Sequence, residues 1–212
     1  MKRFALTSLV LLVLAACSDS TTAPKAAGAW NQRVTPSTNV APLTFRSALV
    51  AAAQNAGKPL TTLVFDEVPF QPVNGLSVEG VTFGFSLNGH PFNDANYNSF
   101  GPDPGPFVQC PCLEGNTRGT LTLTFDKPTT VVEFGVGLST TAPLATGFTV
   151  DVIGPSGKSR GVFPVATSPA PTFTGAEFSY NGAAVSEVVI TFNSEAAARF
   201  VIDNLTYHQA PQ

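Results

Sequence analysis

The segment at residues 88–116, NGHPFNDANYNSFGPDPGPFVQCPCLEGN, holds the side chains best suited to bind a ligand. Aromatic rings alternate there with amides and carboxylates. Such a mixture suits a sugar, because rings stack on its apolar face while polar groups bind its hydroxyls. The alternative is that the rings pack the segment onto the domain, since Phe dominates where sugar platforms favour Trp and Tyr. The residues predicted to bind a ligand are Phe92, Asp94, Asn96, Tyr97 and Phe100.

Two cysteines, Cys110 and Cys112, lie in the same segment and are separated by one residue. In an oxidising compartment they are expected to close a small disulfide loop. A redox switch and a soft-metal clip for copper(I) or zinc are the alternatives. A lone Cys-x-Cys without a nearby histidine offers few ligands for a metal, so the sequence favours the disulfide.

The N-terminus, MKRFALTSLVLLVLAAC, has the layout of a secretory signal. Lys2 and Arg3 precede an apolar run at 4–14 that is too short to span a bilayer core of about 30 Å. The LAAC motif that ends at Cys17 resembles a bacterial lipobox, which implies cleavage before Cys17 and lipidation, palmitate included, on that residue. Ser18 resembles the residue that directs lipoproteins to an outer membrane. The alternative is an ordinary signal peptide with an incidental cysteine.

Composition excludes some partners. Charged residues are only 12% of the chain, and without Lys2 and Arg3 nine basic residues face 14 acidic ones. A mildly acidic chain without a basic cluster is not suited to nucleic acid. Multiple acyl chains on Cys17 would instead hold the protein on a membrane, at about 0.8 kcal/mol per buried CH₂. We therefore expect a lipid-anchored cell-envelope protein, located at the outer membrane.

Catalytic motifs are missing from the sequence. It contains two histidines, His90 and His208, and neither a GxSxG nor an HExxH motif. Asp94, Asp103 and Glu114 are the carboxylates that a glycan hydrolase would need, but their spacing does not indicate a catalytic pair. The sequence therefore predicts that the protein is not an enzyme.

The elements that would position these residues are mostly strands. After a tether rich in Ser, Thr, Ala and Pro, the stretch LTFRSALVAAAQNAGKP at 43–59 predicts one short N-terminal helix. About nine short alternating strands follow, which is typical of an all-β, antiparallel β-sandwich or barrel. The expected strands are 61–68, 75–89, 119–126, 131–139, 146–154, 159–165, 176–182, 185–192 and 198–207. The expected domains are a lipoprotein signal peptide at 1–16, a lipidated N-terminus and tether at 17–42, the β-sandwich at 43–208 and a tail at 209–212.

Several short stretches resemble bacterial exported surface domains of the PEP-CTERM type, which are related in fold to galactose-binding-like carbohydrate-binding modules. These stretches are LVFDEVP, GVTF, LTFDKPTTVVEFGV and VSEVVITFNSEAAARFVIDNLTY. The resemblance spans about 43–208 and implies a jelly roll whose first and last strands are neighbours. The family's C-terminal sorting tail is absent, since the chain ends HQAPQ, and we expect the lipid on Cys17 to serve as the anchor instead.

The resemblance also implies a structural calcium ion where the first and last strands meet. The matching residues are Asp66 and Asp203, with Glu67 and Asn204 beside them. The chemistry is compatible, because calcium takes six to eight oxygen ligands from carboxylates, amides and backbone carbonyls. The alternative is that the two aspartates accept hydrogen bonds from backbone amides or pair with Arg199.

These observations together predict a non-catalytic domain for ligand binding or display, with a polysaccharide as the expected ligand. The alternatives are a structural or adhesive surface protein that binds another protein, and a glycan hydrolase that uses the acids of the segment at 88–116.

Overall fold

The computed structural model describes residues 57, 59–101 and 107–208. Within these ranges the chain forms strands and turns, and none of it forms a helix that is long and apolar enough to cross a bilayer. Four predicted features lie outside the described residues, namely the signal peptide, the tether, the C-terminal tail and, except for its last residues, the N-terminal helix.

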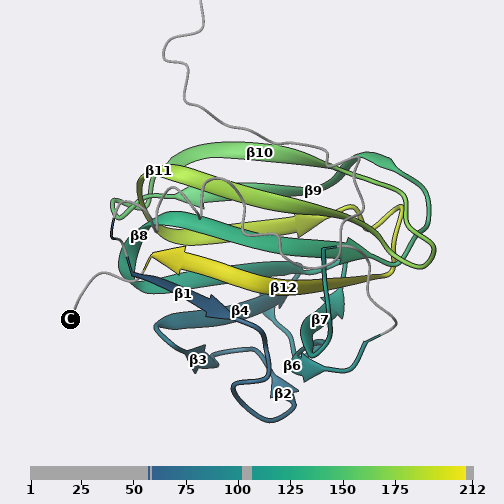
Figure 1. Cartoon of the computed structure of the whole chain (residues 1–212), viewed down its shortest axis with the longest axis horizontal. Helices are drawn as coiled ribbons and strands as arrows, with labels where there is room; N and C mark the ends of the chain where they lie inside the picture. Colours follow the sequence, from purple (N-terminus) through teal and green to yellow (C-terminus); the bar gives the residue numbers. More distant parts are fainter. Residues whose placement is uncertain (1–56, 58, 102–106, 209–212) are drawn as a thin grey trace, which may run out of the picture. The chain divides into compact units, whose positions relative to one another are not determined.

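The described residues form twelve strands in an antiparallel arrangement (Figure 1). The strands are β1 (Leu60–Leu63), β2 (Gln71–Pro72), β3 (Ser77–Val78), β4 (Val81–Leu87), β5 (His90–Pro91), β6 (Ala95–Ser99), β7 (Cys112–Asn116), β8 (Thr120–Leu138), β9 (Leu144–Ile153), β10 (Ser159–Thr167), β11 (Thr174–Phe192) and β12 (Arg199–His208).

The strands make two layers that share β8 and β11. In the first layer, the N-terminal half of β8 lies between β4 and the C-terminal half of β11, and β9 and β10 continue from there. In the second layer, the C-terminal half of β8 lies between β12 and the N-terminal half of β11, and β7, β6 and β2 continue beyond β12. The prediction of an all-β antiparallel sandwich is therefore confirmed.

Both shared strands are longer than predicted. The segments 119–126 and 131–139 were expected as two strands, but β8 runs through both. The segments 176–182 and 185–192 merge in the same way into β11. Val185 still pairs with Thr129 at the point where the strands pass between layers, and shifts in register on either side absorb the bend. The turn-forming residues thus make bulges rather than chain reversals.

The expected strand at 75–89 is divided by a tight turn. Glu79 and Gly80 have φ values of 49° and 85°, and they connect β3 to β4 as a two-residue hairpin. Two successive residues with positive φ are typical of the turn that matches strand twist.

The segment at 88–116 is not a structureless loop. It contains β5, β6 and β7, and its inward side chains alternate with polar outward ones. Ala95, Tyr97 and Ser99 are buried, whereas Asn96 and Asn98 are partly exposed. This alternation of period two was present in ANYNS, but its polar composition is unusual for a strand.

Aromatic rings fill the core between the two layers. Phe200 of the second layer stacks on Phe192 at a centroid distance of 3.9 Å and contacts Phe85 of the first layer at 6.1 Å. Phe125 and Tyr207 make a similar contact at 5.4 Å. Each fully buried Phe stabilises the fold by roughly 1.5–3 kcal/mol through apolar burial. The two layers are therefore held by one continuous core.

A chain segment covers the outer face of the second layer. Residues 107–112 lie against β8, β11 and β12, where Val108 and Cys112 pack with Phe173 and Val201. Gly135 makes room for this cover, because a Cβ atom there would stand 1.8 Å from the carbonyl oxygen of Phe107. We refer to residues 107–112 as the cover segment.

Candidate binding surface

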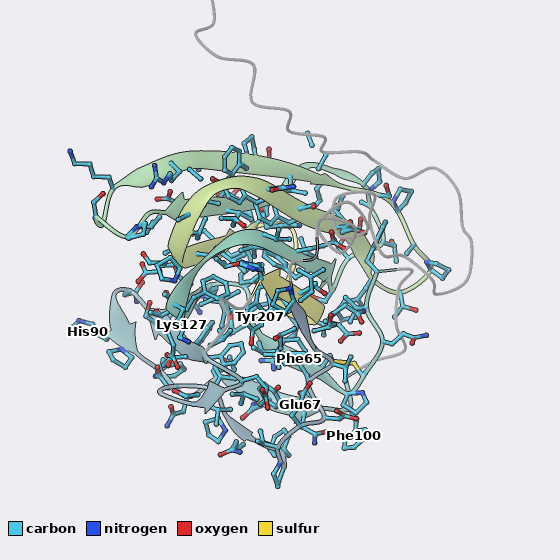
Figure 2. All side chains as sticks on the ribbon, turned by 60° about the vertical axis from the view of Figure 1, so that its left-hand side comes forward. Phe65, Glu67, His90, Phe100, Lys127 and Tyr207 are labelled. Atoms are coloured by element: carbon cyan, nitrogen blue, oxygen red, sulfur yellow. A yellow bond between two sulfur atoms is a disulfide. The ribbon has the colours of Figure 1, made fainter. Side chains whose placement is uncertain are left out.

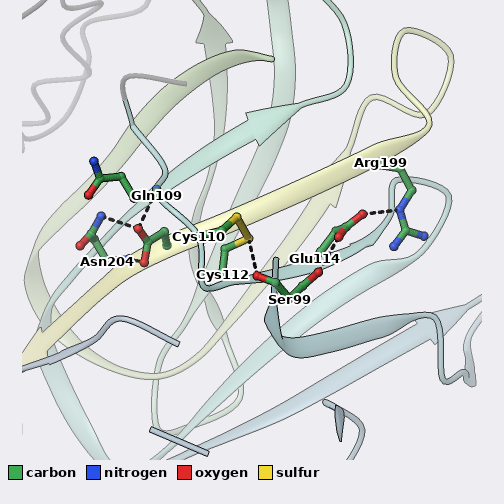
Figure 3. Close-up of a disulfide and its surroundings, with 8 residues drawn as sticks. Ser99, Gln109, Cys110, Cys112, Glu114, Arg199 and Asn204 are labelled. Carbon is green, nitrogen blue, oxygen red and sulfur yellow. Dashed lines mark hydrogen bonds and ion pairs between the residues drawn. A yellow bond between two sulfur atoms is a disulfide. The ribbon is translucent and has the colours of Figure 1, made fainter. Parts of the chain in front are cut away.

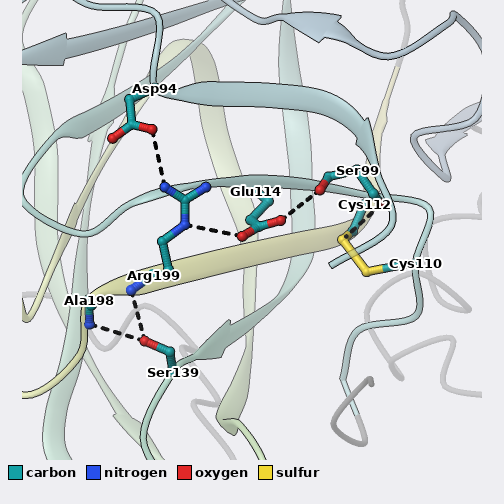
Figure 4. Close-up of polar contacts among 8 residues, drawn as sticks. All are labelled: Asp94, Ser99, Cys110, Cys112, Glu114, Ser139, Ala198 and Arg199. Atoms are coloured by element: carbon teal, nitrogen blue, oxygen red, sulfur yellow. Dashed lines mark hydrogen bonds and ion pairs between the residues drawn. A yellow bond between two sulfur atoms is a disulfide. The ribbon is translucent and has the colours of Figure 1, made fainter. Parts of the chain in front are cut away.

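The side chains with the most ligand-binding potential meet around Arg199, at the start of β12. Its Nε donates to Oε1 of Glu114 at 3.1 Å, and its Nη1 donates to Oδ1 of Asp94 at 3.2 Å (Figure 4). The second oxygen of Glu114 accepts a hydrogen bond from the hydroxyl of Ser99 at 2.6 Å. These contacts join β6, β7 and β12 through one polar network.

The side chain of Ser139 holds the backbone of Arg199 in place. The hydroxyl oxygen of Ser139 accepts hydrogen bonds from the amides of Ala198 and Arg199, at 3.0 and 2.8 Å (Figure 4). Ser139 directly follows β8, so the start of β12 is held beside the end of its neighbour. The guanidinium is thus presented from a fixed strand end rather than from a loop.

The network is accessible to solvent. The side chains of Arg199 and Asp94 are 33% and 36% exposed, whereas that of Glu114 is 18% exposed. Asn96 pairs with Glu114 across the strands and is also partly exposed. At this exposure the ion pairs contribute little to stability, typically about 0–1 kcal/mol each.

An exposed aromatic ring lies next to this network along the chain. Phe100 follows β6 and is 80% exposed, and Figure 2 shows it at the periphery of the molecule. Its neighbour Gly101 lies against Glu114, since a Cβ atom at Gly101 would be 3.2 Å from Oε2. We use the name Arg199 face for Asp94, Asn96, Glu114 and Arg199 together with Phe100, which is adjacent to them along the chain.

Three of the five predicted ligand residues are on this face, namely Asp94, Asn96 and Phe100. Phe92 is 47% exposed but lies between β5 and β6, where its amide donates to the carbonyl of Phe85. The ligand role of Phe92 stays a prediction.

Tyr97 is a core residue rather than a sugar platform. Its ring is fully buried and packs on Phe65 and Phe83 at centroid distances of 4.9 and 5.7 Å. Its hydroxyl donates to Oε2 of Glu67 at 2.5 Å, and burial, followed by this hydrogen bond, raises the pKa of Tyr97. Tyr97 is buried because side chains alternate along β6 and that of Tyr97 points into the core. Composition alone does not show which side of the strand a residue occupies.

The Asp203–Asn204 pair inside β12 forms a bulge. Asn204 has a φ of 56°, and the pairing with β8 shifts register between Asp203 and Thr206. Oδ2 of Asp203 accepts the amide of Gln109 at 2.9 Å, which fastens the cover segment to the sheet (Figure 3). Oδ1 of Asp203 accepts the amide of Asn204 at 2.6 Å. The Asp203 carboxylate therefore accepts backbone N–H groups at a bulge, where the regular hydrogen bonds between β12 and β8 are interrupted.

Asp66 and Glu67 do not lie on a strand beside Asp203. β1 does pair with β12, as the resemblance implied, but it ends at Leu63 and Phe65 turns the chain with a φ of 61°. Asp66 is exposed, and the second oxygen of Glu67 accepts the amide of Val64 at 2.8 Å. Glu67 thus stabilises the turn after β1.

The carboxylate oxygens of Asp203 accept hydrogen bonds from nitrogen donors. Asp203 is surrounded by N–H donors from Gln109 and Asn204, the side-chain amide of Asn204 included at 2.9 Å, and a cation requires oxygen ligands instead. Among the described residues, no group of three or more His, Cys, Asp or Glu side chains is arranged to hold a metal. Calcium at Asp66, Glu67, Asp203 and Asn204 stays a prediction.

Burial changes the ionisation of Asp203. It is 3% exposed, and this desolvation raises its pKa to about 6 although the hydrogen bonds from Gln109 and Asn204 oppose the rise. The sequence allowed two roles for Asp203 without an ion, namely hydrogen bonding to backbone amides and pairing with Arg199. The structure shows hydrogen bonding to backbone amides, and Arg199 pairs with Asp94 and Glu114 instead.

Cys110 and Cys112 form a disulfide in the structure, with a Cα–Cα distance of 4.4 Å (Figure 3). Cys112 is fully buried and Cys110 is partly buried. The bridge lies next to the Arg199 face, since Sγ of Cys112 is 3.5 Å from the carbonyl oxygen of Ser99.

The residues considered for catalysis are not arranged as a catalytic pair. Glu114 and Asp94 bind the same guanidinium, and Asp103 lies outside the described residues. His90 is exposed on β5, whereas His208 ends β12.

No family model and no curated protein matches the chain. Solved structures with a distant likeness include a carbohydrate-binding module of family 29, at 11% identity and a TM-score of 0.37 over 70% of this chain and 88% of that one. A xylan-binding module of family 22 from Paenibacillus barcinonensis Xyn10C matches at 14% identity and a TM-score of 0.33, over 68% and 95%. A cleaved adhesin domain of Lys-gingipain from Porphyromonas gingivalis matches at 10% identity and a TM-score of 0.38, over 72% and 99%. Values this low do not indicate a function.

Proposed function

We propose that this domain is a non-catalytic glycan-binding module that acts through the Arg199 face. The observation that carries the proposal is a partly exposed ionic network whose Glu114 is approached by Ser99 and Gly101, the chain neighbours of a Phe100 ring that is 80% exposed. Exposing a large aromatic ring keeps apolar surface in water, whereas stacking on a sugar would remove that surface from water.

The network has hydrogen-bonding capacity left for a ligand. Arg199 carries five N–H donors, and within the described residues Glu114 and Asp94 each accept one from its side chain. The other carboxylate oxygen of Asp94, Oδ2, has no hydrogen-bond partner among the described residues, so it can accept one from a ligand. A donor and an acceptor held side by side match two neighbouring hydroxyls of a sugar, since each hydroxyl both donates and accepts.

The charge of the face favours neutral glycans. One guanidinium faces the two carboxylates of Asp94 and Glu114, so the local charge is negative. Uronic acids and sulfated sugars would be repelled, whereas neutral hydroxyls are unaffected.

The same geometry supports a binding role over hydrolysis. A glycosidase needs one carboxyl group that donates a proton and a second that stays ionised. Here both carboxylates accept hydrogen bonds from the same guanidinium, that of Arg199, so the geometry does not set one of them apart as a proton donor.

The cellular setting completes the proposal. Lipid on Cys17, supported by the LAAC motif, would display the module at the outer membrane, and polysaccharide would be its partner there. The pairing of β1 with β12 supports the jelly-roll form of the sandwich. Intact-mass analysis of the membrane fraction tests the anchor, since Cys17→Ala should remove the acyl mass.

Affinity electrophoresis tests the binding role. The chain is run through gels that contain xylan, glucomannan or hydroxyethyl cellulose, with pectin and alginate as acidic counterparts. We expect a neutral polysaccharide to retard the protein, and Phe100→Ala and Asp94→Ala to abolish the retardation.

Val162→Ala is the matched control, because Val162 is 58% exposed on β10, at the other end of the strand order. It should migrate like the unmodified protein. Equal retardation of Phe100→Ala and the unmodified protein would contradict the proposal, as would retardation by the acidic polysaccharides alone.

A further inference from the structure

The Cys110–Cys112 disulfide lies next to the Arg199 face and connects residues only two positions apart. A disulfide stabilises a fold mainly by closing a loop of the unfolded chain, and the effect is smallest for the shortest loops. This bridge therefore does little to connect distant parts of the sandwich. Its position needs a further explanation.

The two sulfur atoms differ in accessibility. Cys112 is fully buried on β7, whereas Cys110 is partly exposed in the cover segment. An incoming thiolate therefore reaches the Cys110 sulfur more readily. Thiol–disulfide exchange depends on which sulfur can be attacked, so the reaction has a direction.

A short chain of contacts connects the bridge to the proposed ligand site. Sγ of Cys112 lies 3.5 Å from the carbonyl oxygen of Ser99, the Ser99 hydroxyl donates to Glu114 at 2.6 Å, and Glu114 accepts from Arg199 at 3.1 Å (Figures 3 and 4). The sulfur of a disulfide carries no hydrogen, so its contact with Ser99 is not a hydrogen bond while the bridge is closed.

We propose that Cys110–Cys112 is a reducible site, and that its reduction weakens glycan binding at the Arg199 face. This inference rests on the proposed function for its binding readout. The reductant belongs to the class of dithiols, either a small molecule or a thiol–disulfide oxidoreductase.

The exchange is a two-electron reduction of the protein. One thiolate of the dithiol attacks Sγ of Cys110, the S–S bond breaks, and Cys112 leaves as a thiolate that takes a proton from water. The second thiolate of the dithiol then attacks the mixed disulfide, which releases Cys110 as a thiolate that is also protonated. The protein gains two electrons and two protons, and the dithiol becomes a disulfide.

Reduction changes the contacts on both sides of the bridge. The Cys112 thiol becomes a donor with the Ser99 carbonyl within reach at 3.5 Å. Cys110 is released from β7, which loosens the cover segment whose Gln109 amide is bonded to Asp203. Ser99 donates a hydrogen bond to Glu114, and Gly101 lies so close to it that a Cβ atom there would be 3.2 Å from Oε2, so movement at either residue would shift the carboxylate that binds Arg199.

The experiment uses the full chain and has two arms. In the first, native protein is treated with dithiothreitol and a limiting amount of N-ethylmaleimide, and peptides are mapped by mass spectrometry. We expect Cys110 to be labelled before Cys112 while far-UV circular dichroism stays unchanged. Reduction that occurs only together with loss of the β-signal would overturn the proposal.

In the second arm, oxidised and reduced protein are compared in gels containing xylan, glucomannan or hydroxyethyl cellulose. We expect the reduced form to bind at least about fivefold more weakly, the low end of typical coupling between sites. The double variant Cys110→Ser, Cys112→Ser should behave like the reduced form with and without dithiothreitol. Equal affinity of oxidised and reduced protein would overturn the proposal.

Hydrogen exchange separates this proposal from the proposed function. If oxidised protein binds no polysaccharide, the proposed function fails, and the coupling is judged by amide exchange at 95–99 and 112–116. Faster exchange there on reduction would support a connection between the bridge and the Arg199 face. Unchanged exchange in both strands would contradict it.

Discussion

The two outer faces of the sandwich differ in what lies on them. Within the described residues, the face of the first layer is uncovered and rich in hydroxyls, and its threonines line up across neighbouring strands. They are Thr82, Thr120, Thr122, Thr124, Thr149 and Thr191, all exposed or partly exposed. The face of the second layer is instead covered by residues 107–112, and the polar network around Arg199 lies beside this cover.

The two faces require different residue patterns, because one is covered by a chain segment and the other is not. On the open face, β8 alternates threonines with buried Leu121, Leu123 and Phe125. Under the cover, residues 131–138 of the same strand are all buried, and Gly135 and Gly137 stand where other residues approach the sheet closely. β8 therefore alternates buried and exposed residues where its outer side faces solvent, and is buried on both sides where the cover segment packs on it.

The largest expected effect compares a buried phenylalanine with an exposed one. Phe200→Ala removes a fully buried ring that contacts both layers and should lower the free energy of unfolding by about 3–5 kcal/mol. Phe100→Ala removes a ring that is 80% exposed and should change it by less than about 0.5 kcal/mol. Urea unfolding measures both, and equal losses would refute this assignment of the core.

The next comparison uses one glycine from each face. Gly135→Ala places a Cβ atom 1.8 Å from the Phe107 carbonyl oxygen, so the cover segment must move, at a cost of about 1–3 kcal/mol. Gly84→Ala on the open face meets only the Cβ of Thr122 at 3.7 Å, an ordinary contact. Gly84→Ala should therefore be close to neutral. If chemical unfolding showed a larger loss of stability for Gly84→Ala than for Gly135→Ala, the assignment of the covered and uncovered faces would be wrong.

Acidity should stabilise the covered face. Burial, followed by the nearby carboxylate of Glu133, raises the pKa of Glu177 to about 7, and burial raises that of Asp203 to about 6. Both groups bind protons more tightly in the folded state, so their contribution to stability is full below pH about 4 and is lost as the pH rises through 6 to 7.

We therefore expect a higher melting temperature at pH 5 than at pH 7.5, by about 2–4 °C for each kcal/mol gained. Glu177→Gln should reduce this pH dependence, whereas Glu187→Gln, a carboxylate on the open face, serves as the matched control. Thermal unfolding at both pH values tests the prediction. The same pH dependence in Glu177→Gln and the unmodified protein would exclude Glu177 as its source.

The smallest expected effect concerns divalent ions. The predicted calcium ion would make the melting temperature lower in chelator than in calcium, whereas the N–H donors around Asp203 favour equal melting temperatures. A fall in chelator that calcium restores would instead establish an ion near Asp66, Glu67, Asp203 and Asn204. Asp203→Asn distinguishes the two accounts further, because an amide retains one acceptor for Gln109 but no longer supplies a carboxylate to a cation.

Much of the fold could be predicted because local patterns were clear. Alternation in LTLTF and GFTVDVI predicts half-buried strands, and the segments between them contain turn-forming residues. The segment at 88–116 was harder to interpret, because ANYNS places asparagines on the outward side of a strand. Its aromatic residues then separated in a way that composition does not reveal, with Tyr97 inside and Phe100 outside.

By itself, the sequence determined the strand-rich class, the lipobox resemblance at Cys17 and a cluster of aromatic and polar side chains near residue 95 that is predicted to bind a ligand. Only the tertiary structure decided that Arg199 joins them, because its partners Asp94 and Glu114 are 105 and 85 positions away. Strand order and register set that meeting, and they depend on how two whole layers pack on one core. A local pattern specifies which way a side chain points along its own strand, but not which strand lies beside it.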